Sequence, residues 1–496
     1  MKILLIDSPS ALRDRMDPPR AFMPLALLYL ASILEREGYR VRIYDPKLSA
    51  SLFKTGDYFY FGDSLDIVGQ KIKSFSPDIV GISVLFSRDF DNALKVASVV
   101  KEVNKDIKVI MGGAHPSCAP VECLSNPYVD IVVVGEGERA IIEILQCIKN
   151  GKPLEGVEGI AYKKDGKVMV NEPREFIQDL DELPLPAYHL VDMERYFALQ
   201  RKGFASRPFG GKRSVSIITS RGCPYNCVFC PIHLTMGRKW RAHSAEYVLA
   251  HIKLLVESYN AQCVEFEDDA LAHNRIRFEK IIDGILENDF KISWGTPNGV
   301  RADTINDPKL LEKMKNSGCA YINIGVESGQ QKVLSKIITK NLSLDAVKSV
   351  ARLCKKLNIQ LSAYYVVGFP GETMDDIRVT LEFALELDKK YNVYPYVNYA
   401  IPFLGTRLHI LCKEKGYLTE EVNAKSLLNT THFRGKGLIR TEEFNPQILK
   451  KALVEFHHRF IKNRVIKMWG LPRFIFKDAQ IAFKNPHLAR RILIGR

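Results

Sequence analysis

Strand-like and helix-like patterns alternate along most of this 496-residue chain, and this alternation restricts its fold more than any other feature. In the first 150 residues, five strand-like runs and three amphipathic helical segments take turns. The strand candidates are Lys2–Ile6, Val41–Tyr44, Ile79–Val84, Lys108–Met111 and Asp130–Val134. Such alternation predicts a parallel sheet covered by helices on both faces. Ligands of such sheets bind at the carboxyl ends of the strands.

A second block of alternation begins at Arg213 and contains six strand candidates. They are Ser214–Thr219, Val264–Glu267, Ile292–Pro297, Tyr321–Val326, Gln360–Val367 and Tyr396–Ile401. Helix candidates follow them at Ala245–Tyr259, Ile276–Asn288, Pro308–Asn316, Leu344–Leu357 and Met374–Leu387. Six such repeats predict a partial TIM-like barrel, in which catalytic groups lie at the carboxyl ends of the strands.

Linker signals separate the two blocks. A hairpin-like turn at 163–167 and a proline-rich extended stretch at Leu183–Ala187 fall between them. We therefore predict an α/β chain with four regions. They are a flavodoxin-like, Rossmann-like domain at 1–150, a linker at 151–212, the partial (β/α)6 barrel at 213–407 and a helical C-terminal region at 408–496.

Three closely spaced cysteines follow the first strand of the second block. Cys223, Cys227 and Cys230 lie on one short loop, and no fourth cysteine is nearby. Three thiolates can hold three corners of an iron–sulfur cube and leave one iron open to another molecule. Ordinary electron-transfer clusters use four cysteines, so this loop indicates catalysis. The alternative is a zinc site with His233 as its fourth ligand.

Glycine and small residues gather at the strand ends of the first block. They are Ser83 and Leu85, then Gly112 and Gly113 followed by His115, and finally Gly135 and Glu136. Glycine at a strand end lets the backbone approach a ligand closely. Each cluster taken alone is also typical of tight turns in a flavodoxin-like fold.

Taken together, these motifs resemble the cobalamin-dependent radical S-adenosylmethionine (SAM) enzymes. The CxxxCxxC loop resembles their cluster-binding loop, while Ser83-Val84-Leu85 and Gly112-Gly113 resemble the SxL and GG motifs of their cobalamin domain. The resemblance implies that the three cysteines ligate a 4Fe–4S cluster whose fourth iron chelates SAM. It also implies that SAM is cleaved to a 5′-deoxyadenosyl radical.

One motif of many cobalamin domains is missing. Those domains carry DxHxxG after the first strand, and its histidine binds cobalt from below. This chain has Asp7-Ser-Pro-Ser-Ala-Leu12 there. We therefore expect base-off cobalamin without a histidine ligand from that loop, and we expect His115 to lie near the corrin as a loop residue. Leu85, Phe86 or solvent are the candidates for the lower side of cobalt.

The barrel strand ends also resemble the family. GVESG at 325–329, GFPGET at 368–373 and PFLGT at 402–406 are phrases of this kind. The resemblance implies contacts with SAM from Asp268, Glu327, Ser328 and Gly368. Arg301 is a candidate partner of the SAM carboxylate, with a structural ion pair as the alternative. The carboxylates at 267–269 should repel one another, so we expect them to have a cationic or hydrogen-bonding partner.

The resemblance implies methylation of an unactivated carbon. A substrate radical, formed by hydrogen abstraction, would take a methyl group from methylcobalamin. Ring cyclisation or rearrangement, as in the anaerobic porphyrin-ring cyclase, is the alternative within the family, and a cobalamin or redox sensor is the non-catalytic alternative. A methylthiotransferase is disfavoured because Cys118, Cys123 and Cys147 stand in unsuitable sequence contexts.

Much of the net charge of +14 lies near the C-terminal end, where residues 459–496 contain ten Lys or Arg and one acid. Aromatic residues, among them Trp469, are interleaved with these charges. A helix on an anionic membrane surface and a docked helix with a solvated basic face explain this tail equally well, and nucleic-acid binding ranks third.

We expect a cytoplasmic protein, with peripheral membrane contact as an option. The start of the chain lacks a signal-peptide cleavage site, and no run approaches the ~18 apolar residues of a membrane span. The expected partners are a small-molecule substrate, with an apolar lipid or a tetrapyrrole as hypotheses, and an electron donor such as flavodoxin or ferredoxin.

Overall fold

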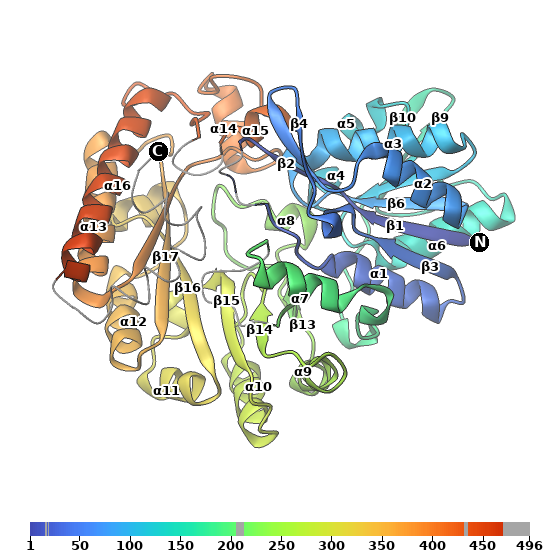
Figure 1. Ribbon diagram of the computed structural model, residues 1–496. Coiled ribbons are helices and arrows are strands. Elements are labelled where there is room, and N and C mark those ends of the chain that lie inside the picture. Colours follow the sequence, from blue (N-terminus) through green and yellow to red (C-terminus); the bar gives the residue numbers. More distant parts are fainter. Residues whose placement is uncertain (15–16, 18, 205–212, 431–434, 470–496) are drawn as a thin grey trace.

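The N-terminal block folds into a seven-stranded sheet with the order β10-β9-β8-β7-β6-β1-β3. The computed structural model describes residues 1–14, 17, 19–204, 213–430 and 435–469 (Figure 1). Five strands of this sheet are parallel: β1 (Lys2–Asp7), β3 (Arg40–Tyr44), β6 (Ile79–Ser83), β7 (Lys108–Gly112) and β8 (Ile131–Val133). The five strands predicted from the sequence are thus confirmed.

Helices cover both faces of this sheet, as the sequence predicts. Ile3 and Leu5 of β1 pack toward α1 (Leu25–Arg36) and α6 (Gly137–Asn150). Leu4 and Ile6 point the other way, toward α2 (Leu65–Phe75) and α3 (Phe90–Val103). Because side chains alternate along a strand, a run of apolar residues in β1 serves two cores at once.

A hairpin extends the sheet past residue 150. Strands β9 (Ile160–Lys164) and β10 (Lys167–Val170) pair with each other, and β9 adds to β8 in antiparallel fashion. The turn predicted at 163–167 is therefore present, but its two strands belong to the first sheet. The hairpin covers the edge that β8 would otherwise expose.

A small antiparallel sheet was not predicted. It consists of β2 (Ser10–Leu12), β5 (Tyr58–Phe61) and β4 (Leu52–Thr55), in that order. Leu12 and Phe61 from this sheet pack against Leu199 of α7 (Met193–Arg201). The loop after β1 is thereby attached to the segment that leads into the second block.

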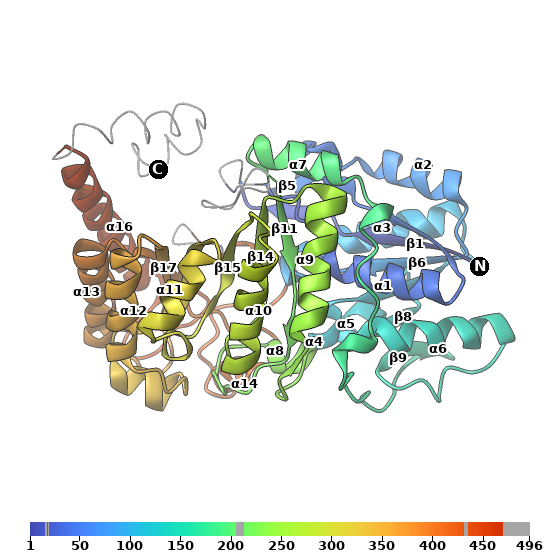
Figure 2. The ribbon, with the colours of Figure 1, turned by 90° about the horizontal axis from the view of Figure 1, so that it is seen from below.

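The second block forms the predicted partial barrel. Its six strands are parallel and follow one another in chain order: β11 (Ser214–Ile217), β14 (Cys263–Phe266), β15 (Ser293–Val300), β16 (Cys319–Glu327), β17 (Gln360–Val367) and β18 (Tyr394–Tyr399). The outer helices are α9 (Ala245–Tyr259), α10 (Arg275–Glu287), α11 (Pro308–Asn316), α12 (Leu344–Lys356) and α13 (Met374–Tyr391). Figures 1 and 2 show these helices outside the curved sheet.

The C-terminal region contacts both domains. It contains α14 (Arg407–Glu414), α15 (Ala424–Leu428) and α16 (Pro446–Trp469). Helix α15 packs against η2 (Ser87–Asp89) of the first domain. Helix α16 lies along α13, and Leu449 and Leu453 join the core of the barrel (Figure 1).

The first charges of the basic tail are used for this docking. Arg464 Nη2 lies 2.7 Å from Oδ1 of the buried Asp388, and Arg459 forms an ion pair with Glu382. This part of the tail is therefore a docked helix, but Arg459 and Arg464 pair with carboxylates where a solvated basic face was expected. Residues 470–496 lie outside the described residues. Within the part of the chain that the structure describes, no helix is long and apolar enough to cross a membrane.

Candidate active site

The cysteine loop leaves the barrel through a short strand and a glycine. Strand β12 (Ser220–Arg221) pairs with β13 (Arg241–Ala242) just before Gly222. Gly222 has a φ of +79°, and a Cβ there would overlap the carbonyl oxygen of Lys239. Cys223 N then donates to Gly237 O at 3.2 Å. Glycine is required here because the chain folds tightly back on itself.

Two distant segments, residues 338–339 and Arg407, hold the remainder of the loop. Val228 N donates to Ile338 O at 3.0 Å. The hydroxyl of Thr339 and the guanidinium of Arg407 both donate to the carbonyl oxygen of Asn226. These contacts fix the backbone that carries the cysteines, so the loop is preorganised by the fold.

The three thiols are half-buried and close enough to influence one another. Burial raises the pKa of all three, and it raises that of Cys230 to about 12. The neighbouring thiols add to the shift in Cys227 and Cys230, while Lys340 opposes it in Cys227. A metal must displace the thiol protons, and soft thiolate donors suit iron–sulfur clusters.

The zinc alternative depends on His233, and one ring nitrogen of this residue contacts the backbone of the cysteine loop. His233 Nδ1 lies 3.1 Å from Cys230 O. Among the described residues, no group of three or more His, Cys, Asp or Glu side chains is arranged to hold a single metal ion. Three thiols on one loop without a fourth cysteine instead fit a larger cluster with one open iron.

Asp268, at the end of β14, ties the barrel to the start of this loop. Its carboxylate accepts hydrogen bonds from Thr219 N at 3.1 Å, from Thr219 Oγ1 at 2.8 Å and from the Ser220 hydroxyl. Burial raises the pKa of Asp268, whereas Arg277 and these donors lower it. The expected partner of the carboxylate cluster is therefore present, and Asp268 is occupied by protein groups.

Asp269 is a site residue that the sequence reasoning did not single out. Its side chain is accessible to water yet surrounded by protein on most sides, and this burial, with the charges of Asp268 and Glu267, raises its pKa to about 7. Its charge acts on the thiols of Cys223 and Cys230. Among the described residues it has no hydrogen-bond or ion-pair partner, so its carboxylate is available to a ligand.

Glu327 and Ser328 lie at the end of β16. Glu327 Oε1 is 2.7 Å from Lys340 Nζ, and both side chains are buried. The φ of Glu327 is +67°, where the pairing of β16 with β17 shifts register. Backbone strain of this kind clusters at functional sites. Ser328 Oγ lies 2.9 Å from Oγ1 of Thr380 in α13.

Arg301 forms the structural ion pair that the sequence left as its alternative. Its Nη2 lies 2.6 Å from Asp303 Oδ2, and its Nη1 donates to Lys340 O at 2.9 Å. The guanidinium also stacks 3.9 Å from the ring centre of Tyr225, within the cysteine loop. Arg301 thus supports the loop through Tyr225.

Gly368 is a turn residue beneath α16. Its φ is +92°, and its N–H donates to Glu372 Oε2 at 2.8 Å. A Cβ at this position would lie 2.8 Å from Cδ1 of Leu449. Both its conformation and the close approach of α16 therefore require glycine.

The SxL and GG loops of the first domain interlock. Val84 N donates to Gly112 O at 2.8 Å, and His115 N donates to Val84 O at 3.2 Å. Gly113 has a φ of +113°, and a Cβ there would lie 2.7 Å from Val84 O. Ser83 ends β6, and the side chain of Leu85 beyond it is 59% exposed. An apolar side chain beside close-set glycines suits a flat ligand at these strand ends.

His115 has the buried polar group expected of a binding site. Its ring packs against Phe90, with centroids 4.4 Å apart, and is 1% exposed. Burial lowers its pKa to about 4, so it is neutral near pH 7. Within the described residues neither ring nitrogen has a hydrogen-bond partner. Buried polar groups are normally hydrogen-bonded, so an unpaired buried imidazole indicates a partner such as a ligand or water. These loops therefore fit a corrinoid.

An ion pair holds the last residue of β1, just before the loop in which a histidine was expected to be missing. Lys47 forms an ion pair with Asp7, lies 3.2 Å from Asp45 Oδ1 and donates to Ser8 O at 3.1 Å. Burial raises the pKa of Asp7 to about 6, opposed by Lys47. Tyr196 donates to Asp45 Oδ2 at 2.7 Å and anchors the pair to α7.

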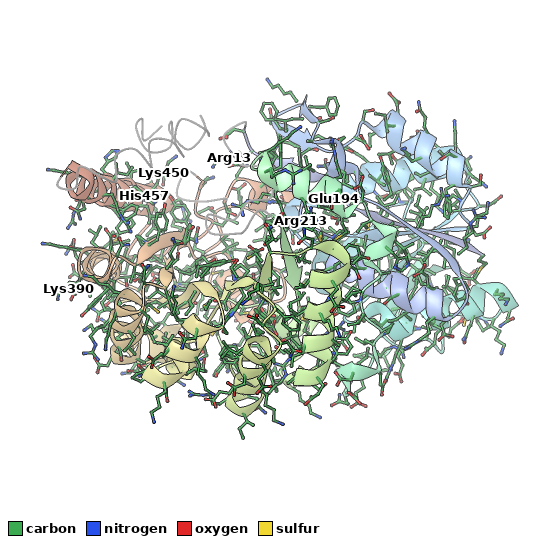
Figure 3. The ribbon with its side chains drawn as sticks, turned by 60° about the horizontal axis from the view of Figure 1, so that its bottom comes forward. Arg13, Glu194, Arg213, Lys390, Lys450 and His457 are labelled. Carbon is green, nitrogen blue, oxygen red and sulfur yellow. The ribbon has the colours of Figure 1, made fainter. Side chains whose placement is uncertain are left out.

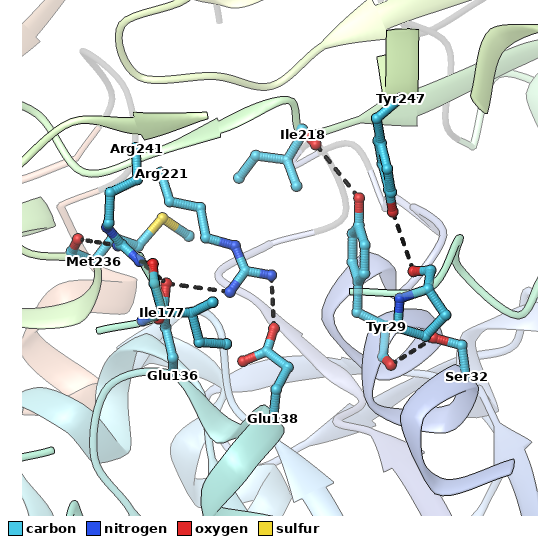
Figure 4. A network of polar contacts seen from close by, with 11 residues as sticks. Tyr29, Ser32, Glu136, Glu138, Ile177, Ile218, Arg221, Met236, Arg241 and Tyr247 are labelled. Atoms are coloured by element: carbon cyan, nitrogen blue, oxygen red, sulfur yellow. Dashed lines mark hydrogen bonds and ion pairs between the residues drawn. The ribbon is translucent and has the colours of Figure 1, made fainter. Parts of the chain in front are cut away.

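Glu136 is engaged with the barrel. Its Oε1 lies 2.8 Å from Arg241 Nη1 and 3.2 Å from Arg221 Nη1, and its Oε2 accepts from Ile177 N at 2.8 Å (Figure 4). Gly135 N donates to Ser117 Oγ at 2.9 Å. Both carboxylate oxygens of Glu136, a predicted cofactor contact, are thus bonded to protein groups.

The two sets of loops meet at a pair of short helices. Helix α4 (Ala114–Cys118) carries His115, and α8 (Ile232–Thr235) begins two residues after Cys230. The two helices contact each other (Figure 2). The strand ends of the first sheet therefore face the cysteine loop of the barrel.

Comparisons with known proteins agree with this arrangement. The B12 binding domain family matches residues 20–145, and the Radical SAM superfamily matches residues 217–384. A Pyrococcus horikoshii protein described as an uncharacterized methyltransferase is 34% identical over 96% of this chain and 99% of its own length. The cytidylyl-2-hydroxyethylphosphonate methyltransferase of Streptomyces wedmorensis is 29% identical over 88% of this chain and 85% of its own.

A solved structure shares the whole fold. The cobalamin-dependent SAM radical enzyme OxsB, with aqua-cobalamin bound, superposes with a TM-score of 0.71 at 17% identity. The match covers 100% of this chain and 72% of that one.

Replacing Cys227 tests the cluster. Cys227→Ala should lose most of the iron and acid-labile sulfide after anaerobic reconstitution, because one of three protein-held corners is gone. Cys147→Ala in α6 is the matched control and should retain both. Equal iron content in the two variants would contradict the assignment.

Replacing His115 should change apo stability and cofactor affinity in opposite directions. His115→Leu removes unsatisfied buried polar atoms, so the apo protein should gain about 1–3 kcal/mol in the free energy of unfolding. The same change should weaken hydroxocobalamin binding about 2- to 10-fold, as expected for one lost neutral hydrogen bond. Thermal unfolding and absorbance titration measure the two effects. An unchanged dissociation constant would show that His115 does not contact the corrinoid.

Proposed function

The chain belongs to the radical SAM enzymes that carry a B12-binding domain, and we propose that it methylates an unactivated carbon of a small molecule. Its cofactors are a 4Fe–4S cluster, SAM and cobalamin. The contact between α4 and α8 carries the proposal, since it brings the corrinoid-binding strand ends next to the cluster-binding loop. The relative that matches along its whole length is described as a methyltransferase, which agrees with this reaction.

The bound groups supply radical and methyl-transfer chemistry, and the residues of the chain place them. Cys223, Cys227 and Cys230 would hold three irons of the cluster. Asp269 lacks a protein partner among the described residues, so its carboxylate suits the ammonium group of SAM. The pair of Glu327 and Lys340 would lie beside them, because both charges act on Cys227.

On the cobalamin side, the backbone of Gly112 and Gly113 would approach the corrinoid, with Ser83, Leu85 and His115 around it. The neutral imidazole of His115 can donate one hydrogen bond and accept another. We propose base-off binding without a histidine from the loop after β1. Lys47 and Asp7 form their ion pair at the start of that loop. Exclusion of water would follow from α15, which packs against the η2 turn next to Leu85 and Phe86.

Other predicted contacts are better explained as support. Three charged side chains are already bonded to protein groups: Asp268, Arg301 and Glu136. They would therefore position the loops rather than touch a cofactor. Gly368 and Ser328 would shape the strand ends beside SAM. The lipid and tetrapyrrole hypotheses depended on the basic tail, and two of its charges, Arg459 and Arg464, instead dock α16 on the barrel. The proposal therefore extends only to a small organic substrate.

Product mass tests the reaction. Reconstituted protein, given a strong reductant, SAM with a trideuterated methyl group and cytidylyl-2-hydroxyethylphosphonate as the first candidate substrate, should form a product in which one hydrogen is replaced by the labelled methyl group. 5′-Deoxyadenosine and S-adenosylhomocysteine should appear with it, and Cys227→Ala should form neither product nor 5′-deoxyadenosine.

Other outcomes identify the alternatives. Loss of hydrogen without methyl gain, with any substrate in a panel, would indicate cyclisation or oxidation and contradict methyl transfer. Wild-type protein given reductant and SAM, but no substrate, should still form some 5′-deoxyadenosine. If it forms none, a cobalamin or redox sensor would be favoured over an enzyme.

A further inference from the structure

Arg221 lies at the point where the barrel passes into the cysteine loop, two residues before Cys223, and its side chain is buried. Its guanidinium reaches across to the first domain. Nη2 lies 2.6 Å from Glu138 Oε1, and Nη1 lies 3.2 Å from Glu136 Oε1. Glu136 precedes α6, and Glu138 stands in its first turn (Figure 4). One side chain therefore joins the cysteine loop to the loop that follows β8.

A second arginine completes a balanced network. Arg241 is the strand partner of Arg221 in the β12–β13 ladder, and its Nη1 lies 2.8 Å from Glu136 Oε1. It also donates to Ile177 O at 2.6 Å and to Met236 O at 2.7 Å. Two guanidinium groups thus face two carboxylates. Burial works to raise the pKa of Glu138, but Arg221, a backbone hydrogen bond and Arg241 together hold that pKa below its usual value.

Tyr29 of α1 supports the same side chain. Its ring centre lies 5.6 Å from the Arg221 guanidinium, and its hydroxyl donates to Ile218 O at 3.5 Å (Figure 4). Helices α1 and α6 of the first domain therefore both contact the segment that leads into the cysteine loop. Helix α8, which contacts α4, follows the last cysteine of the loop, so the cysteine loop is held to the first domain at both of its ends.

Stability alone does not explain such a network. Taking charged groups out of water costs more than many ion pairs return, and a well-packed apolar pair can be equally stable. Arginine instead offers a rigid planar fork with fixed bond directions. Direction matters in this enzyme because a misplacement of about 1 Å can reduce a rate about 100-fold.

We propose that Arg221, held by Glu138 and Glu136, is a positioning residue that sets the separation and orientation of the cluster and the cobalamin. The inference rests on the proposed function, since it requires both groups to be bound. It assigns no direct contact between Arg221 and either group.

The test separates positioning from stability by removing the charges in two ways. Arg221→Met leaves Glu138 buried without its partner and should lower the melting temperature of the apo protein. Arg221→Met with Glu138→Met removes both charges, while Glu136 keeps Arg241, so the melting temperature should return toward that of the wild type. Arg221→Lys keeps the charge but loses the fork and should be intermediate.

The decisive readout is magnetic and needs no substrate. In wild-type protein reconstituted with the cluster and with cobalamin in its Co(II) form, chemical reduction of the cluster should enhance the relaxation of the cobalt signal in electron paramagnetic resonance. The double variant should bind both groups in wild-type amounts and lose part of this enhancement. The matched control is Arg213→Met with Glu194→Met, which removes an ion pair of 2.6 Å at the other end of β11 (Figure 3) and should keep the enhancement.

Different results would overturn the role of Arg221 and the proposed function. A double variant with both groups bound and full enhancement would overturn the role of Arg221 and leave the proposed function intact. Full enhancement in Arg221→Lys would also overturn it, whether or not the double variant folds. Wild-type protein that takes up no corrinoid would overturn the proposed function and the inference with it.

Discussion

The buried carboxylate of Asp268 fixes the point from which the site is built. It binds the backbone and hydroxyl of Thr219 and the hydroxyl of Ser220, so the ends of β11 and β14 are joined where the cysteine loop begins. Arg277 reinforces this point by donating from Nη2 to Thr219 O at 2.8 Å. Arg221 and Gly222 follow directly and restrict the path of the backbone. Arg221 is held by two carboxylates, and Gly222 lies in a turn where no Cβ fits.

The same geometric rule operates in both sheets. Parallel strands bring their carboxyl ends to one edge, and ligands bind there. In this chain the two edges face each other across α4 and α8, so loops far apart in sequence become one site. The C-terminal region follows from that arrangement, because α15 contacts the first domain while α16 covers the edge of the barrel.

The residue pattern was sufficient to predict the strands, the partial barrel of six strands and the cysteine loop, because each leaves a local signal in the sequence. Apolar runs mark buried strands, and the cysteine spacing marks the cluster. Partners across the fold leave no such signal. Asp268, Arg301 and Glu136 look alike in sequence whether they meet a cofactor or a protein group, and the structure pairs each with protein. Asp269 could have been found, since it is the last of three adjacent acids. The β2–β5–β4 sheet was missed because its strands are only three or four residues long.

Anomalous diffraction from crystals of the loaded protein would show whether the strand-end edges of the two sheets hold cobalt and iron at one interface. Data collected at the iron and cobalt absorption edges should place an iron peak at Cys223, Cys227 and Cys230. They should place a cobalt peak at the loops of Leu85 and Gly113, on the side that faces α8. A cobalt peak elsewhere, or iron at a site without these cysteines, would contradict the account.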